Sequence, residues 1–350
     1  MGKKRAWSLG ALGLSAMLLL GACSSGGGGT GDSGSSDGAD KGGDDKSYKL
    51  KMSVTVNDSS TWYQAAEKLA NDMKEETDGR ITIDLFPNEQ LSGGDSGKGV
   101  ELLAKGSTDL SFHSTIIYSI LDPRLGVASA PFLFKDTEGV DKVFGGSGGE
   151  AITEILQEKG VQALGYGENG FRQITNSKHE IKSPDDLKGL KIRIPGITMY
   201  TDLYRELGAD PTTMTFSEVF TSLQQGTING QENPIDVIHS SKLNEVQDYI
   251  TMWNYSYDPL VLGINKKLLD SMSEEDQALF TKLGKEAAAY QVELAREKEA
   301  QQIEELKATG MQFYEPTEAE LATFTEKVQP VYDKYKDIWG EDLLKAFQDQ

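Results

Sequence analysis

The chain has 350 residues, of which 37% are hydrophobic, and its formal net charge at pH 7 is −20. An excess of 55 acidic over 35 basic residues argues against nucleic acid or an anionic membrane surface as the partner. Cys23 is the only cysteine, which excludes an intramolecular disulfide, a thiolate metal cluster and a Cys-His catalytic pair in the folded part.

Residues 1–22 have the organisation of a secretory signal peptide. A basic segment, KKR, precedes an apolar run over residues 7–20, which is too short to span a bilayer comfortably. The sequence LGAC at residues 20–23 resembles the lipobox of bacterial lipoproteins, in which the cysteine is lipidated and becomes the first mature residue. The alternative is an ordinary cleavage site beside an incidental cysteine. We therefore expect an extracytoplasmic protein, in the periplasm or on the outer face of the cytoplasmic membrane, anchored by lipid at Cys23.

Residues 23–46 are predicted to be a flexible acidic tether. They contain no apolar residue larger than alanine after Cys23, so they cannot form a core. Removal of residues 1–22 would leave 32 basic against 55 acidic residues, a net charge of −23. An anionic ligand would therefore need a local basic pocket. The remaining length, roughly 300 residues, is typical of two domains.

The folded part opens with three strand–helix alternations. The patterns predict a strand at 48–56, a helix capped near Ser60 and ended by Gly79, a strand at 80–87, a helix at 97–107 and a strand at 108–114. This order is typical of an α/β sheet with right-handed crossovers.

A second run of the same kind begins near residue 160. It comprises a strand pattern at 160–176, a short helix started by Ser183 and ended by Gly189, a strand at 190–195, a helix at 198–208, a strand at 210–214, and a capping box, Thr215 to Glu218, that opens a helix closing at Gly226. Two α/β lobes are the economical interpretation, with the seam at residues 167–170.

One helical pattern is unusually long. It is capped at Ser273 and runs over about 273–309 until Gly310 ends it. At about 1.5 Å per residue it would extend some 50 Å, so we expect it to cross both lobes. The predicted boundaries are 47–169 with 258–297 for lobe 1, and 170–257 with 298–350 for lobe 2.

Motifs for catalysis are absent from the sequence. His113, His179 and His239 are far apart without metal-ligand spacing, and no GxSxG, P-loop or strand-linked GxGxxG occurs. No pair among the 55 acids stands out for hydrolysis, although an exported hydrolase stays an alternative. We therefore expect neither an enzyme nor a bound metal or cofactor.

The second predicted lobe offers side chains suited to a small anion: Arg172, Arg193, Asn233 and Phe216. Arginine presents a planar fork of donors that matches a carboxylate, and Phe216 suits a carbon skeleton. Each has a plainer interpretation. The arginines would be salt-bridge partners, Asn233 a turn former before a proline, and Phe216 a core residue. Alternation along the strand would also let Arg193 face water.

Two long segments resemble the signature region of DctP-type solute receptors of tripartite ATP-independent periplasmic (TRAP) transporters. They read ENGFRQITNSKHEIKSPDDLKGLKIRIPG at 168–196 and ADPTTMTFSEVFTSLQQGTINGQENPIDVI at 209–238. The likeness extends over nearly all of the folded chain. It implies a periplasmic-binding-protein-like fold, in which two α/β lobes joined by a hinge close over a small organic acid and a long helix spans both.

The resemblance also implies roles for individual residues. Arg193 corresponds to the arginine that ion-pairs with the ligand carboxylate, Arg172 to a second arginine near that group, Asn233 to an amide that helps hold it, and Phe216 to the aromatic at the ligand. The loaded receptor, expected to be a monomer, would deliver its ligand to a membrane permease driven by an ion gradient. Docking on a sensory protein is the alternative.

Two departures concern specificity. Ser114 stands where the sialic-acid receptors resemble one another by carrying a glutamate, and Thr55 stands where they have an asparagine. These differences argue against a sialic-acid ligand. C4-dicarboxylates, sugar acids and other small carboxylates all stay open.

Overall fold

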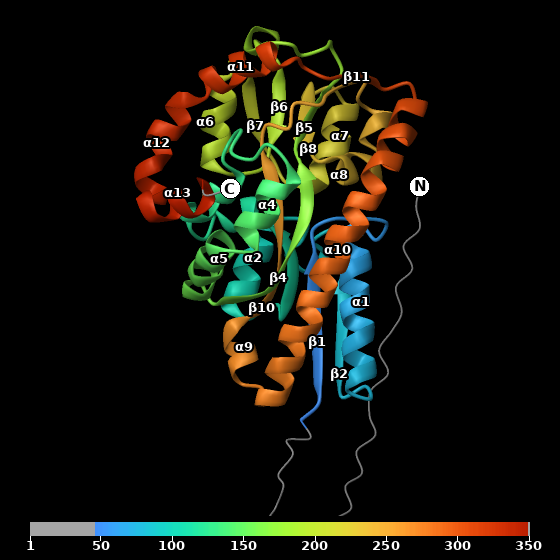
Figure 1. Ribbon diagram of the computed structural model, residues 1–350. Coiled ribbons are helices and arrows are strands. Elements are labelled where there is room, and N and C mark those ends of the chain that lie inside the picture. Colours follow the sequence, from blue (N-terminus) through green and yellow to red (C-terminus); the bar gives the residue numbers. More distant parts are fainter. Residues whose placement is uncertain (1–45, 349–350) are drawn as a thin grey trace, which may run out of the picture. The chain divides into compact units, whose positions relative to one another are not determined.

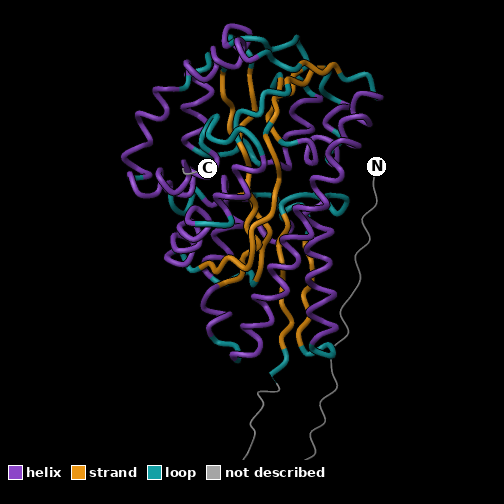
Figure 2. Tube along the Cα trace, in the orientation of Figure 1, coloured by secondary structure: helices purple, strands orange, loops and turns teal. Residues whose placement is uncertain are grey.

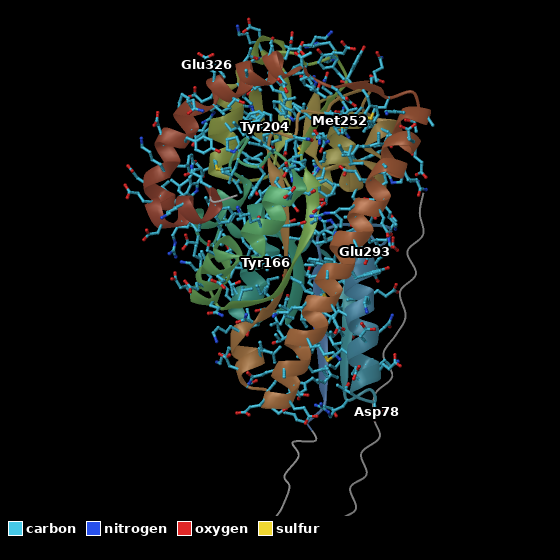
Figure 3. The ribbon with its side chains drawn as sticks, viewed as in Figure 1. Asp78, Tyr166, Tyr204, Met252, Glu293 and Glu326 are labelled. Atoms are coloured by element: carbon cyan, nitrogen blue, oxygen red, sulfur yellow. The ribbon has the colours of Figure 1, made fainter. Side chains whose placement is uncertain are left out.

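The computed structural model describes residues 46–348, so the predicted signal peptide, Cys23 and nearly all of the tether lie outside the described part. The described chain is built on two mixed β-sheets, one for each lobe (Figures 1 and 2). In Figure 3, Tyr166 lies among the elements of the first sheet, and Tyr204 and Met252 lie among those of the second. No helix within residues 46–348 combines the length and apolarity needed to cross a membrane.

The first sheet, sheet A, has the strand order β2-β1-β3-β10-β4. Its strands are β1 (Tyr48–Val54), β2 (Ile81–Phe86), β3 (Leu110–Ser114), β4 (Val161–Phe171) and β10 (Tyr257–Asn265). The first three pair in parallel, as their strand–helix alternation predicts, whereas β10 pairs antiparallel with β3 and β4.

The second sheet, sheet B, has the order β11-β9-β5-β8-β6-β7. Its strands are β5 (Gln173–Asn176), β6 (Lys191–Ile194), β7 (Asp210–Thr213), β8 (Gly230–Asn233), β9 (Tyr249–Thr251) and β11 (Gln312–Tyr314). Strands β6, β7 and β8 are parallel, and β5 pairs antiparallel with β8 and β9.

Thirteen α-helices among the described residues surround the sheets: α1 (Thr61–Glu76), α2 (Ser96–Lys105), α3 (Thr115–Tyr118), α4 (Thr137–Phe144), α5 (Ser147–Glu158), α6 (Thr198–Glu206), α7 (Val219–Gln224), α8 (Ile235–Ser240), α9 (Lys266–Asp270), α10 (Glu274–Ala308), α11 (Glu318–Lys327), α12 (Gln329–Trp339) and α13 (Glu341–Gln348). The predicted caps form where the side chain reaches a free amide: Ser60 accepts from the N–H of Tyr63, and Ser273 from that of Asp276.

Two predicted helix starts differ in the structure. Ser183 and Asp186 do form a capping box, but the helix it opens is a single 3-10 turn over Pro184–Leu187. The capping box predicted at Thr215 does not form. The Thr215 hydroxyl donates to the Glu218 carboxylate at 2.8 Å, and no side chain there accepts a hydrogen bond from a backbone N–H at the start of the helix. A 3-10 turn therefore precedes α7 there.

The two sheets are joined where strands pass from one to the other. Strand β4 ends at Phe171 and β5 begins at Gln173, while the return passes between β9 and β10. The N–H of Arg172 donates to the carbonyl of Ser256 at 2.8 Å, which ties the two crossings together. The side chain of Arg172 is therefore held at the junction of the lobes.

Helix α10 lies alongside both lobes (Figure 1). Its first half buries Phe280 and Leu283 in the core that covers sheet A, and its end buries Leu306 in the core beside sheet B. A third apolar core includes Ile152 and Ile192, one from each lobe. The C-terminal helices join this core, with Phe347 of α13 packed 5.8 Å from Phe144 between ring centroids.

Candidate functional site

A cavity lies where the two lobes meet. It encloses about 420 Å³ of space that no protein atom fills, counting the part open to solvent. Residues of both lobes line it, and all six binding residues predicted from the sequence are among them: Thr55, Ser114, Arg172, Arg193, Phe216 and Asn233. Residues separated by up to 178 positions are thereby brought to one place.

Arg193 is buried, with 4% of its surface exposed, so the interpretation of a water-facing arginine is wrong. Its neighbours Ile192 and Ile194 are fully buried as well, and they hold β6 in the lobe. The guanidinium donates from Nε and Nη2 to the carbonyl of Met214, at 3.2 and 2.9 Å, and lies 5.7 Å from the centre of the Phe216 ring.

The charge of Arg193 is not neutralised by an acid. Among residues 46–348 only two arginines are buried, and Arg193 has no carboxylate within 4.0 Å. Burial lowers the pKa of Arg193, and the nearby positive charge of Arg172 lowers it further. Glu232 partly offsets these effects, and the resulting pKa is about 10. The guanidinium is still charged at neutral pH, so the cavity contains a cation without a counterion.

Arg172 has the opposite environment. Nε and Nη2 donate to the carboxylate of Glu232, and Nη1 donates to that of Asp258. Nη2 also donates to Oδ1 of Asn233 at 3.1 Å. Burial by itself would lower the pKa of Arg172, but the two carboxylates raise it well above its usual value. The salt-bridge interpretation of this arginine is therefore correct.

Asn233 and Phe216 also line the cavity, and each has protein contacts of its own. The Asn233 amide donates to Oε1 of Gln231 at 2.5 Å and accepts from Arg172. Phe216 is partly buried and packs against the apolar cores of both lobes. Its ring lies beside the Arg193 guanidinium, where an aromatic face favours a cation.

Ser114 and Thr55 supply hydroxyls from the first lobe. Ser114 ends β3, where its oxygen accepts from the N–H of Ile116 and its proton is donated to Asp258. Thr55 follows β1 and donates to Oε1 of Glu89 at 2.9 Å. Both hydroxyl protons are thus used by internal carboxylates.

The sequence profile of the family described as bacterial extracellular solute-binding protein, family 7 (DctP), matches residues 52–337. The chain belongs to the DctP family. Its members bind solutes and are not enzymes, so the prediction of a non-enzymatic receptor is confirmed at the level of the family. The two-lobe fold is confirmed as well, because related crystal structures superimpose over most of the chain.

Relatives of this DctP-family chain include the 2,3-diketo-L-gulonate-binding periplasmic protein YiaO of Escherichia coli, which is 33% identical over 85% of this chain and 90% of its own length. A TRAP periplasmic solute-binding protein of Ralstonia eutropha, solved with (S)-2-acetolactate, has a TM-score of 0.83 and 34% identity over 86% of this chain and 97% of its own. The sugar acid binding protein DctPAm of Advenella mimigardefordensis, solved with galactonate, has a TM-score of 0.83 and 32% identity over 87% and 97%.

Asp258 and Asn169 line the cavity of this DctP-family member but escaped the sequence reasoning, as did Glu89, the hydrogen-bond partner of Thr55. Asp258 is fully buried, and its carboxylate accepts from Ser114, Asn169 and Arg172. An acid at the head of the apolar strand DPLVLGIN was the available signal, because a carboxylate there is buried with its strand. Burial raises the pKa of Asp258, against the effect of Arg172. Nothing in the sequence distinguished Asn169 or Glu89 from other polar residues.

Proposed function

We propose that this protein is a receptor that binds a small organic acid between its lobes through Arg193. The observation that carries the proposal is a buried guanidinium without a carboxylate partner, in a cavity lined by both lobes. Burying an unpaired charge is costly, so such a site persists where a ligand anion supplies the missing partner. A carboxylate is the natural partner, because it accepts two parallel hydrogen bonds from one guanidinium.

The other predicted residues support Arg193 in this proposal. Arg172 orients Asn233 and keeps the lobe junction in place, while Phe216 covers the ligand's carbon skeleton. Thr55 and Ser114 contact the ligand from lobe 1, formed by residues 47–169 and 258–297, and the others belong to lobe 2, formed by 170–257 and 298–350. The relatives named above take acids, which supports a carboxylate, whether a sugar acid or a C4-dicarboxylate.

The proposal includes the place of the receptor in transport. The closed, loaded form delivers its ligand to the membrane subunits of a TRAP transporter, which the solved relatives' assignment to TRAP systems supports. Lipid on Cys23, in the LGAC sequence, holds the receptor at the outer face of the membrane, and residues 23–46 let it reach the permease.

The test begins with a thermal-shift screen of small carboxylates, because a specific ligand raises the melting temperature by mass action. The tightest acid is then measured by calorimetry against variants. We expect Arg193→Ala to weaken binding about 100-fold or more, because the ligand anion loses its charge-assisted bonds, and Arg193→Lys to restore it only in part. The exposed Arg205 offers a matched control, and Arg205→Ala should bind as wild type. Wild-type affinity in Arg193→Ala would refute the proposal.

A further inference from the structure

The wall that lobe 1 contributes to the cavity presents hydrogen-bond acceptors. We call it the acceptor wall and define it by Thr55, Ser114, Asn169 and Asp258. The carboxylate of Glu89 accepts the hydrogen bond that the Thr55 hydroxyl donates. Burial alone would raise the pKa of Glu89, but His113 and the hydrogen bonds from Thr55 and Ser53 outweigh burial and lower it. An ionised carboxylate can only accept, so Oγ1 of Thr55 keeps lone pairs and no proton for a ligand.

Asp258 orders the rest of this wall in the same way. Nδ2 of Asn169 donates to Oδ2 of Asp258 at 2.6 Å, and Ser114 donates to Oδ1. This bond fixes the orientation of the Asn169 amide, since its oxygen cannot face a carboxylate. Oδ1 of Asn169 is therefore a buried acceptor without a protein partner. Asn169 is only 6% exposed, and it lines the cavity, where a ligand can reach it.

The charges around the cavity also favour a ligand that donates hydrogen bonds to the acceptor wall. Arg172 is paired with both Glu232 and Asp258, so these three groups together carry one excess negative charge, whereas Arg193 has no carboxylate of its own. Once a ligand carboxylate pairs with Arg193, that negative excess is left beside the ligand. A second carboxylate would meet acceptors and the charge of Asp258 on the acceptor wall. Like charges and unpaired acceptors are effective means of rejecting a ligand.

We infer that the ligand is a monocarboxylate carrying hydroxyl groups, whose O–H groups donate to Thr55, Ser114 and Asn169 while its carboxylate binds Arg193. Dicarboxylates without hydroxyls are rejected. This inference rests on the proposed function and narrows its ligand class. Arg193, at one end of the cavity, donates hydrogen bonds, and the acceptor wall accepts them. A ligand with a carboxylate at one end and hydroxyl groups along the rest therefore satisfies both.

The experiment compares acids of equal carbon number by calorimetry. The four-carbon set is butyrate, D-erythronate and succinate, and the six-carbon set is hexanoate, D-galactonate and adipate. We expect the hydroxylated acid of at least one set to bind about 100-fold more tightly than its two counterparts, because a polar site rejects an analogue that leaves its groups unpaired. If a dicarboxylate or an unsubstituted acid binds most tightly and Arg193→Ala abolishes this binding, the inference is overturned and the proposed function stands. Binding of none of the six overturns the inference, while the proposed function is decided separately by the carboxylate screen and the Arg193→Ala comparison.

Substitutions at Thr55 test the acceptor wall itself. Thr55→Val removes the oxygen at nearly constant shape, and we expect it to lower the affinity ratio of the hydroxylated to the unsubstituted acid about three- to tenfold. Thr55→Ser keeps the oxygen and should keep the ratio. Thr281→Val, on the exposed face of α10, controls for the substitution. Equal losses in Thr55→Val and Thr55→Ser would show that shape, not acceptance, is recognised, and would refute this role of Thr55.

Discussion

Arg172 and Arg193 lie in the same cavity, yet their removal should change the free energy of unfolding in opposite directions. Arg172→Met leaves Glu232 and Asp258 buried without their cation, so we expect a loss of about 3–5 kcal/mol. Arg193→Met removes a buried cation without a carboxylate partner, so we expect the ligand-free protein to gain about 1 kcal/mol. Urea unfolding of both variants, followed by fluorescence, measures the two changes.

The sign for Arg193 follows from its pKa of about 10 in the folded protein, which is below the usual pKa of an arginine. The folded state holds this proton less readily than the unfolded chain does, so the charged side chain lowers stability below pH 10. The gain from Arg193→Met should be fully present at neutral pH and shrink as the pH rises above 10. A destabilised Arg193→Met protein at pH 7 would mean that the guanidinium has a partner in the ligand-free state.

Helix α10 packs against β4 so closely that glycine is required at the contact. A Cβ on Gly284 would lie 2.5 Å from Cβ of Leu164, closer than side-chain atoms approach one another. Replacing glycine by alanine inside a helix normally stabilises it by about 1 kcal/mol. Here we expect Gly284→Ala to destabilise the protein by about 1–3 kcal/mol through overpacking.

Thermal unfolding measures the effect of Gly284→Ala. Thr281→Ala is the control, because Thr281 is exposed one turn earlier in the same helix, and this change should be neutral or slightly stabilising. A rise in melting temperature for Gly284→Ala would contradict the close packing of α10 on β4.

At the scale of helices and strands, the sequence predicts those features that depend only on residues adjacent in the chain. Ser273 and Gly310 delimit α10 because caps act within one turn, and alternation identified β6 with Arg193 between two isoleucines. The antiparallel place of β10 was not predictable, since it depends on pairing with β3, about 150 positions earlier in the sequence. The contact of Asp258 with Ser114 depends on that pairing, so the acceptor wall could not be found in the sequence.

At the scale of the whole receptor, α10 connects the lobes through buried amides. Gln291 is fully buried, accepts from the N–H of Glu168 at 2.6 Å and donates to its carbonyl at 2.8 Å. Towards the end of the helix, Gln302 donates to Asp236 at 2.7 Å. Opening of the lobes would therefore have to bend α10 or break one of these contacts.

Closure of the lobes is the last prediction. Direct contacts join them near the cavity: Asn57 donates to the carbonyl of Ser240 at 2.9 Å, and Ser217 to that of Gly94 at 3.3 Å. A ligand that touches both lobes favours the closed state by its differential affinity. We expect X-ray scattering to give a smaller radius of gyration with the calorimetrically verified acid than without it, and no change in Arg193→Ala. Asn57→Ala, which loses one closing contact but no ligand contact, should bind a few-fold more weakly, mainly through faster dissociation. Equal radii with and without ligand would contradict closure on binding. They would mean that the ligand-free receptor is already closed, so that the ligand has no open population to convert.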